Sequence, residues 1–259
     1  MKEVGQQKQQ DGLGYEMVNQ FKLDMYLSPQ TEGLFAELQN VVCADIDFSS
    51  CLPEQARQKL CLGQICGIDF ATSRLDEYRY LATFSLSDQA VPSGYYRSVL
   101  ITPAKGGLAS LDAFSADRHL VAINETGSFS GALTFSKRML GSGKDRFPHH
   151  HITGSHAASL GCIARADAML ASIDCLSFKM ALRQSPDLKH HIKVLGYTDP
   201  FPGLPFVTSA QMPDDVCTLM TKRLFRFITG DRAKLWTDRL GVVSIIELSA
   251  DVYHQMRSV

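Results

Sequence analysis

The sequence lacks the features that would place it at once in several broad classes of protein. It contains no run of about 18 or more apolar residues, so no segment predicts a membrane-spanning helix. Its formal net charge is -1 at pH 7, so no excess of positive charge indicates binding to nucleic acid or to an anionic membrane. Residues 1–20 are polar and lack the apolar core of a secretory signal; they predict a flexible lead-in and, on sequence alone, a cytoplasmic protein.

Cysteine is present, but in no pattern that predicts a metal site. The seven cysteines are an odd number, and no two of them form a C-x-x-C pair. Cys61 and Cys66 are separated by four residues, but no second pair completes a zinc pattern. The number and spacing of the cysteines favour buried thiols in a reducing compartment, and a disulfide between two of the cysteines is the alternative. The histidine runs 149–151 and 190–191 are interpreted as solvated loops, so we predict no metal and no cofactor.

The order of apolar patterns predicts an α/β fold. The 259 residues suffice for one large or two medium domains, and 45% of them are hydrophobic. Predicted strands alternate with helical segments, which indicates a mostly parallel sheet covered by helices. The predicted strands are 21–26, 44–48, 60–67, 78–84, 95–101, 120–123, 168–173, 192–196 and 206–209. The predicted helices are 34–42, one that opens at Pro53, 110–114, 132–140, 157–166 and 175–183, and two that close the chain, 213–229 and 233–240.

Two connections divide the chain into two predicted lobes. The first lies at Thr102–Pro103, and the second is the proline-rich passage 200–205. Lobe one takes residues 21–102 and 204–259, and lobe two takes residues 103–203. Ligands of open α/β sheets bind beyond the carboxyl ends of the strands, so two facing lobes predict a cleft between them.

A small, hydroxyl-rich turn lies between the predicted strand 120–123 and the predicted helix 132–140. It contains Ser128 and Ser130, and the first backbone N–H groups of a helix have no intrahelical partner. Two hydroxyls and several free N–H groups can bind an oxyanion. The alternative is that one of these serines only caps the helix.

Two further junctions repeat this arrangement. Thr153–His156 precedes the predicted helix 157–166, and Asp174 ends a predicted strand just before Cys175. A ligand contact is one interpretation of His156 and Asp174. A structural histidine and a helix-capping aspartate are the alternatives, because strand–Asp–helix junctions are common.

From residue 21 onward the chain contains, in this order, the blocks Leu23–Tyr26, Gly63–Gly67, Tyr96–Ser98, Asn124–Gly131, Thr153–Ser159, Ala171–Asp174 and Pro202–Thr208. No single block is specific, but five or more of them occur in the order of a known family. Taken together, they resemble the phosphate/phosphite/phosphonate-type substrate-binding proteins of ABC importers, in the compact branch of that family.

The resemblance implies a two-lobed, periplasmic-binding-protein-like (type 2) fold with a hinge and an interlobe ligand cleft. It implies a binding protein rather than an enzyme, a phosphonate-like oxyanion as ligand and an ABC transporter permease as partner. The family's exported members carry a signal peptide, so the resemblance implies the periplasm although the chain shows no such signal.

The resemblance also assigns residues to the ligand. Ser128 and Ser130 would hold the anion, His156 would donate to it, and Asp174 would accept from an amino or protonated group. The aspartate would favour a zwitterion such as an aminoalkylphosphonate over a simple dianion. The lobe-one wall would contain Tyr26, Gln64 and either Tyr95 or Tyr96, and the two turns would add Phe129 and Ser155.

The sequence allows three alternative functions. The first is a cytoplasmic sensor or accessory protein of the same fold that binds a small anion. The second is an enzyme on this fold, similar to some thiamine-pyrimidine biosynthetic proteins, which would use Cys66 or Cys175 with His156. The third, a Ser128–His156–Asp174 hydrolase, is disfavoured because the chain lacks a G-x-S-x-G motif and the familiar triad orders.

Overall fold

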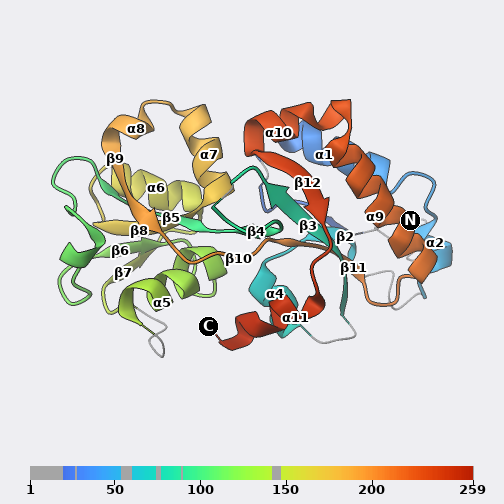
Figure 1. Cartoon of the computed structure of the whole chain (residues 1–259), viewed down its shortest axis with the longest axis horizontal. Coiled ribbons are helices and arrows are strands. Elements are labelled where there is room, and N and C mark those ends of the chain that lie inside the picture. Colours follow the sequence, from blue (N-terminus) through green and yellow to red (C-terminus); the bar gives the residue numbers. More distant parts are fainter. Residues whose placement is uncertain are drawn as a thin grey trace, which may run out of the picture.

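The structure is a computed structural model that describes residues 20–26, 28–53, 60–73, 77–88, 90–141 and 147–258. Figure 1 shows two α/β lobes side by side along the long axis, with β4 and β10 between them. The predicted lead-in, apart from Gln20, and the body of the helix predicted to open at Pro53 lie outside the described residues.

Lobe one contains a five-stranded sheet in the order β1-β2-β11-β3-β12. Helices α1, α9 and α10 lie on one side of this sheet, and α4 and α11 lie on the other (Figure 1). The only parallel pair described in it is β1 with β2, and the other neighbours are antiparallel. Its strands are β1 (Gln20–Lys22), β2 (Leu60–Gln64), β3 (Tyr78–Leu86), β11 (Pro205–Ser209) and β12 (Val242–Ile246). Its helices are α1 (Glu32–Val42), α2 (Phe48–Cys51), α4 (Gly67–Thr72), α9 (Asp214–Thr229), η3 (Asp231–Ala233), α10 (Lys234–Leu240), α11 (Ala250–His254) and η4 (Gln255–Ser258).

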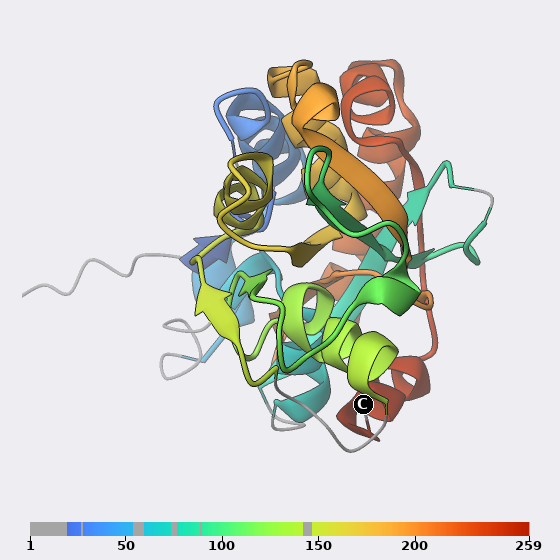
Figure 2. The same cartoon turned by 90° about the vertical axis from the view of Figure 1, so that its left-hand side faces the viewer.

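Lobe two contains a second five-stranded sheet in the order β7-β6-β8-β5-β9. Helix α5 covers one face, and α6 and α7 cover the other, as Figure 2 shows with lobe two toward the viewer. Its strands are β5 (Ser98–Pro103), β6 (Val121–Ile123), β7 (His150–Ile152), β8 (Leu170–Asp174) and β9 (Ile192–Tyr197). Its helices are η1 (Leu111–Ala113), the π-helical turn η2 (Phe129–Leu133), α5 (Thr134–Leu140), α6 (His156–Ala164), α7 (Cys175–Gln184) and α8 (Leu188–His191).

Both sheets are mixed, so the prediction of a mostly parallel sheet is wrong. Strand β6 is parallel to β7 and β8, but β5 is antiparallel to β8 and β9. The reason is that β5 and β11 begin just after the chain has crossed between the lobes. They therefore run antiparallel to their neighbours in the two sheets.

Local predictions failed at several places, of which four affect the element order most. The predicted strand 44–48 is a turn that leads into α2, because Asp47 caps that helix by accepting from the backbone N–H of Ser49. The predicted helix 110–114 is the single 3-10 turn η1. The predicted strand 95–101 is divided at Arg97 into β4 and β5. The last predicted helix does not close the chain, because β12 and α11 follow it.

The two lobes are joined by β4 (Tyr95–Tyr96), which pairs antiparallel with β10 (Phe201–Pro202). The Tyr96 and Phe201 rings lie 4.3 Å apart, and the Phe129 ring packs edge-on against Phe201 at 5.1 Å. These buried aromatic rings give the hinge an apolar core. The predicted lobe boundaries stay a prediction, except that β5 lies wholly in the second sheet, so the first crossing comes before Ser98.

Three helices begin where strands of lobe two end. Strand β6 leads into η2 and α5, β7 leads into α6, and β8 leads directly into α7. Because β6, β7 and β8 run parallel, these three helix N-termini lie along the same edge of the sheet. Backbone N–H groups and their partial positive charge therefore gather at this edge.

Candidate functional site

A cleft of about 550 Å³ lies between the lobes, at the edge where these helices begin. From lobe one it is lined by the loop after β1 and by the start of α4. From lobe two it is lined by the turns before η2 and α6 and by one side of α7. The described lining residues are Asp24, Met25, Tyr26, Ser28, Cys66, Asp69, Tyr96, Asn124, Glu125, Gly127, Ser128, Ser130, Ser155, His156, Ala157, Asp174, Ser177, Met180, Ala181, Gln184 and Leu204.

Most of the residues predicted to contact the ligand line this cleft, although they come from separate segments of the chain. The predicted residues that line it are Tyr26, Tyr96, Ser128, Ser130, Ser155, His156 and Asp174. Three others lie outside it. Tyr95 points away because neighbouring side chains of β4 alternate, and Phe129 packs into the hinge core. Gln64 is fully buried within β2, where neither end of its amide group has a hydrogen-bond partner in the described part of the chain.

The turn before η2 combines a helix cap with free donors. The Ser128 hydroxyl oxygen accepts from the backbone N–H of Gly131 at 3.1 Å, so Ser128 does cap this helix and its O–H remains able to donate. A side chain at Gly131 would overlap the Asn124 side chain, which itself lines the cleft. Glycine is therefore required for this turn to pack against Asn124.

His156 lies beside the same turn. Its Nε2 atom is 3.0 Å from the Ser130 hydroxyl oxygen, and its Nδ1 atom has no hydrogen-bond partner within the described ranges. Burial lowers the pKa of the imidazole, and the nearby Asp174 carboxylate opposes that shift. Because the pKa is lowered on balance, His156 is a neutral partner of the turn at neutral pH.

Asp174 links the two lobes. One carboxylate oxygen accepts from the backbone N–H groups of Leu176 and Ser177, at 2.8 and 2.9 Å, and so caps α7. The other oxygen accepts from the Tyr26 hydroxyl of lobe one at 3.0 Å. One carboxylate oxygen therefore has the helix-capping role that was the predicted alternative. The other oxygen makes a buried contact across the cleft.

The cleft contains more carboxylates than the sequence predicted. Asp24, Asp69 and Glu125 are exposed residues that line it, in addition to the buried Asp174. No lysine or arginine is among the described lining residues. Asp24 and Glu125 belong to blocks noted in the sequence, but Asp69 carried no signal, because folding alone brings it to the cleft. The positive potential here comes from helix N-termini rather than from basic side chains.

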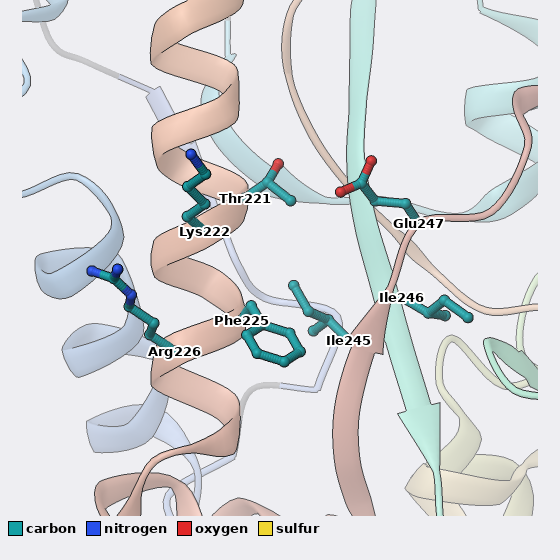
Figure 3. A pocket seen from close by; sticks show the side chains of 7 residues that line it. All are labelled: Thr221, Lys222, Phe225, Arg226, Ile245, Ile246 and Glu247. Atoms are coloured by element: carbon teal, nitrogen blue, oxygen red, sulfur yellow. The ribbon is translucent and has the colours of Figure 1, made fainter.

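A second groove lies on lobe one between α9 and β12, with a volume of about 240 Å³. Figure 3 shows that Phe225 and Ile245 face each other across it, whereas Lys222 and Arg226 extend away from Glu247. Its polar groups do not converge on one point, so it lacks the arrangement by which the cleft can orient a small ligand.

Comparison with known proteins identifies the family. The family model "ABC transporter, phosphonate, periplasmic substrate-binding protein" matches residues 47–253. The chain belongs to this family of phosphonate substrate-binding proteins. No curated protein matches the chain.

Solved structures of phosphonate-binding proteins share the fold. The binding protein of an ABC phosphonate transporter from Pseudomonas aeruginosa is 14% identical, with a TM-score of 0.71 over 92% of this chain and 83% of that chain. PhnD1 from Prochlorococcus marinus, solved with methylphosphonate, is 12% identical, with a TM-score of 0.67 over 92% of this chain and 94% of that chain. These similarities confirm the predicted two-lobed, periplasmic-binding-protein-like fold.

As a member of the phosphonate substrate-binding family, the protein is a solute-binding protein. The family implies a small ligand and an ABC transporter as partner, and it favours neither the sensor nor the enzyme alternative. In the part of the chain that the structure describes, no helix is long and apolar enough to cross a membrane. No group of His, Cys, Asp and Glu among those residues could hold a metal ion.

The described geometry does not favour the residues of the two enzyme alternatives. Burial raises the pKa of the Cys66 thiol, and it raises the pKa of Cys175 to about 12. Both cysteines are therefore thiols rather than thiolates at neutral pH. In the hydrolase alternative Asp174 would orient His156, but its described hydrogen bonds go to Tyr26 and to the start of α7.

His156 leads to a prediction about pH. Because the pKa of His156 is lowered in the folded protein, the unfolded chain takes up a proton at this histidine at a higher pH than the folded protein does. The stability of the fold is therefore complete above the unfolded pKa of about 6.5 and decreases as pH falls below it. The thermal midpoint of the wild type should therefore fall more steeply between about pH 6.5 and 5 than that of His156→Gln. His190→Gln, at an exposed position, is the control and should keep the wild-type slope. Equal slopes for His156→Gln and wild type would contradict the lowered pKa.

Proposed function

We propose that this protein captures a small phosphonate that also carries an ammonium group, and delivers it to an ABC importer. One observation carries the proposal. The cleft combines hydroxyls and helix N-termini, which suit an anion, with four carboxylates, which suit a cation, and its described lining includes no lysine or arginine. An aminoalkylphosphonate has both charges in one small molecule.

The phosphonate group would lie at the turn before η2. There it would accept from the hydroxyls of Ser128 and Ser130 and from backbone N–H groups at the starts of η2 and α6. In the tautomer with its proton on Nε2, His156 would donate to the Ser130 hydroxyl oxygen. That arrangement leaves the Ser130 hydroxyl proton to go to the ligand in place of the neighbouring Tyr96 hydroxyl.

The ammonium group would lie near Asp174. A carboxylate has about four acceptor positions, and the described partners of Asp174 use two on one oxygen and one on the other. One position beside the Tyr26 contact is therefore left for a ligand donor. Asp24, Asp69 and Glu125 would attract the cation further and would repel a simple dianion.

We propose binding without turnover. The buried thiols are protonated at neutral pH, and His156 lies against Ser130 rather than against a described acidic partner. The transporter's permease is the proposed protein partner.

The proposal predicts a graded thermal-shift result with matched ligands. At a concentration a hundredfold above its dissociation constant, 2-aminoethylphosphonate should stabilise the protein by about 2.7 kcal/mol, which raises the midpoint by roughly 5–10 °C. Ethylphosphonate, which lacks the amine, and taurine, which replaces the phosphonate by a sulfonate, should give smaller shifts at the same concentration. Incubation followed by phosphorus NMR should show unchanged 2-aminoethylphosphonate. No shift with any phosphonate would contradict the proposed ligand class, and a changed ligand would contradict binding without turnover.

A further inference from the structure

The backbone carbonyl of Ser130 accepts two hydrogen bonds from buried serine hydroxyls. The Ser98 hydroxyl donates to it at 2.9 Å, and the Ser172 hydroxyl donates to it at 2.7 Å. Both donors are almost completely buried, with 0% and 1% of their surface exposed. Neither of them lines the cleft. Ser98 and Ser172 therefore contact the turn on its side away from the cleft, and they do not contact the ligand site.

The two serines come from neighbouring strands of lobe two. Ser98 begins β5 opposite Asp174, and Ser172 lies on β8 opposite Leu100. Because both hydroxyls reach the same oxygen atom, they stand on the same face of the sheet, beneath η2. Two central strands thus hold one carbonyl of the anion-binding turn.

Ser98 is also attached to the hinge. It follows β4 by two residues, and its backbone N–H donates to the Thr198 hydroxyl at 3.0 Å. The backbone N–H of Thr198 donates in return to the Ser98 carbonyl at 3.0 Å. The strands that enter and leave lobe two are therefore fixed to each other at the residue that holds Ser130.

We propose that Ser98 and Ser172 are positioning residues that hold the 128–131 turn in its anion-binding form. Fixing the Ser130 carbonyl fixes the peptide plane to Gly131 and with it the direction of the neighbouring N–H groups and hydroxyls. All of these groups belong to lobe two. The two contacts that fix the Ser130 carbonyl thus lie within lobe two. This inference rests on the proposed phosphonate function.

A carbonyl signal reports the positioning contact directly, with or without ligand. Labelling serine with ¹³C at the carbonyl and glycine with ¹⁵N selects three peptide groups in this chain, Ser93–Gly94, Ser130–Gly131 and Ser142–Gly143. The Ser130–Gly131 signal is assigned by its loss in Ser130→Ala. Ser98→Ala and Ser172→Ala should each shift the Ser130 carbonyl resonance and leave the other two signals in place.

Thr208→Val is the matched control. The Thr208 hydroxyl is fully buried in lobe one and donates to the Cys61 carbonyl at 2.7 Å, so this variant loses the same type of bond far from the cleft. Each serine variant should weaken 2-aminoethylphosphonate binding about tenfold, and the control should leave the affinity unchanged. Ser98→Cys and Ser172→Cys keep the side-chain size with a weaker donor, and should give intermediate losses if an alanine variant fails to fold.

The possible outcomes separate the two proposals. A shifted Ser130 carbonyl together with weakened binding supports the positioning role. An unshifted carbonyl, or unchanged affinity despite the shift, overturns it. A wild-type protein that binds no phosphonate overturns the proposed function, and with it this role in binding, whereas the carbonyl signal still shows whether the contacts exist.

Discussion

Replacing Asp174 by alanine is expected to lower the free energy of unfolding by about 3 kcal/mol, from the lost helix cap and the lost bond to a buried carboxylate. The carboxylate accepts two backbone N–H groups at the start of α7 and the Tyr26 hydroxyl from the other lobe. The variant leaves these donors unpaired, and the Tyr26 hydroxyl is buried. The thermal midpoint should fall by roughly 6–12 °C for a chain of this size.

Two control variants separate the cap from the contact between lobes. Asp174→Asn retains a capping oxygen and should lose much less stability. Asp47→Ala removes the exposed cap of α2, which has no partner in lobe two among its described hydrogen bonds, and should have a smaller effect than Asp174→Ala. If Asp174→Ala cost no more than Asp47→Ala in denaturant unfolding, the Tyr26 bond would contribute nothing to stability.

Replacing both Ser128 and Ser130 by alanine should weaken phosphonate binding by about 10²–10⁴-fold. Each serine is proposed to donate one hydrogen bond to a charged oxygen, worth about 1.5–3 kcal/mol, and about 1.4 kcal/mol corresponds to a factor of ten. Titration calorimetry with 2-aminoethylphosphonate measures the loss. The single variants should each show a smaller decrease.

Loss of a helix cap alone must be distinguished from loss of the ligand contact. Ser249→Ala removes a serine that caps α11 by accepting from the backbone N–H of Asp251, and Ser249 is not among the described residues that line the cleft. This control should show wild-type affinity. A Ser128→Ala/Ser130→Ala variant that folds and binds as tightly as Ser249→Ala would rule out the turn as the anion site.

The sequence predicted the parts of the site that depend on local chemistry. Serine or aspartate between an apolar strand and a helix predicts a cap, and Ser128, Ser155 and Asp174 do cap η2, α6 and α7. The parallel strands β6 and β8 could be predicted from their apolar runs. Together with the parallel pairing of these strands, the junctions place the helix N-termini at the cleft.

Features that depend on contacts between distant segments could not be predicted. Strand β2 is buried on both faces, so no alternation indicates that Gln64 lies inside lobe one instead of lining the cleft. The Tyr26–Asp174 bond joins residues 148 positions apart, and no local pattern marks such a pair. Asp69 lies in the first turn of an ordinary short helix and reaches the cleft only through the lobe arrangement.

The most direct test of the central claim is a crystal structure of the protein with 2-aminoethylphosphonate. The account predicts phosphonate density at the start of η2, with oxygens within hydrogen-bond distance of the Ser128 and Ser130 hydroxyls. It predicts the amine within reach of the Asp174 carboxylate, beside Tyr26. Density at the groove between α9 and β12 instead, or a reversed ligand with its amine at the serine turn, would contradict the account.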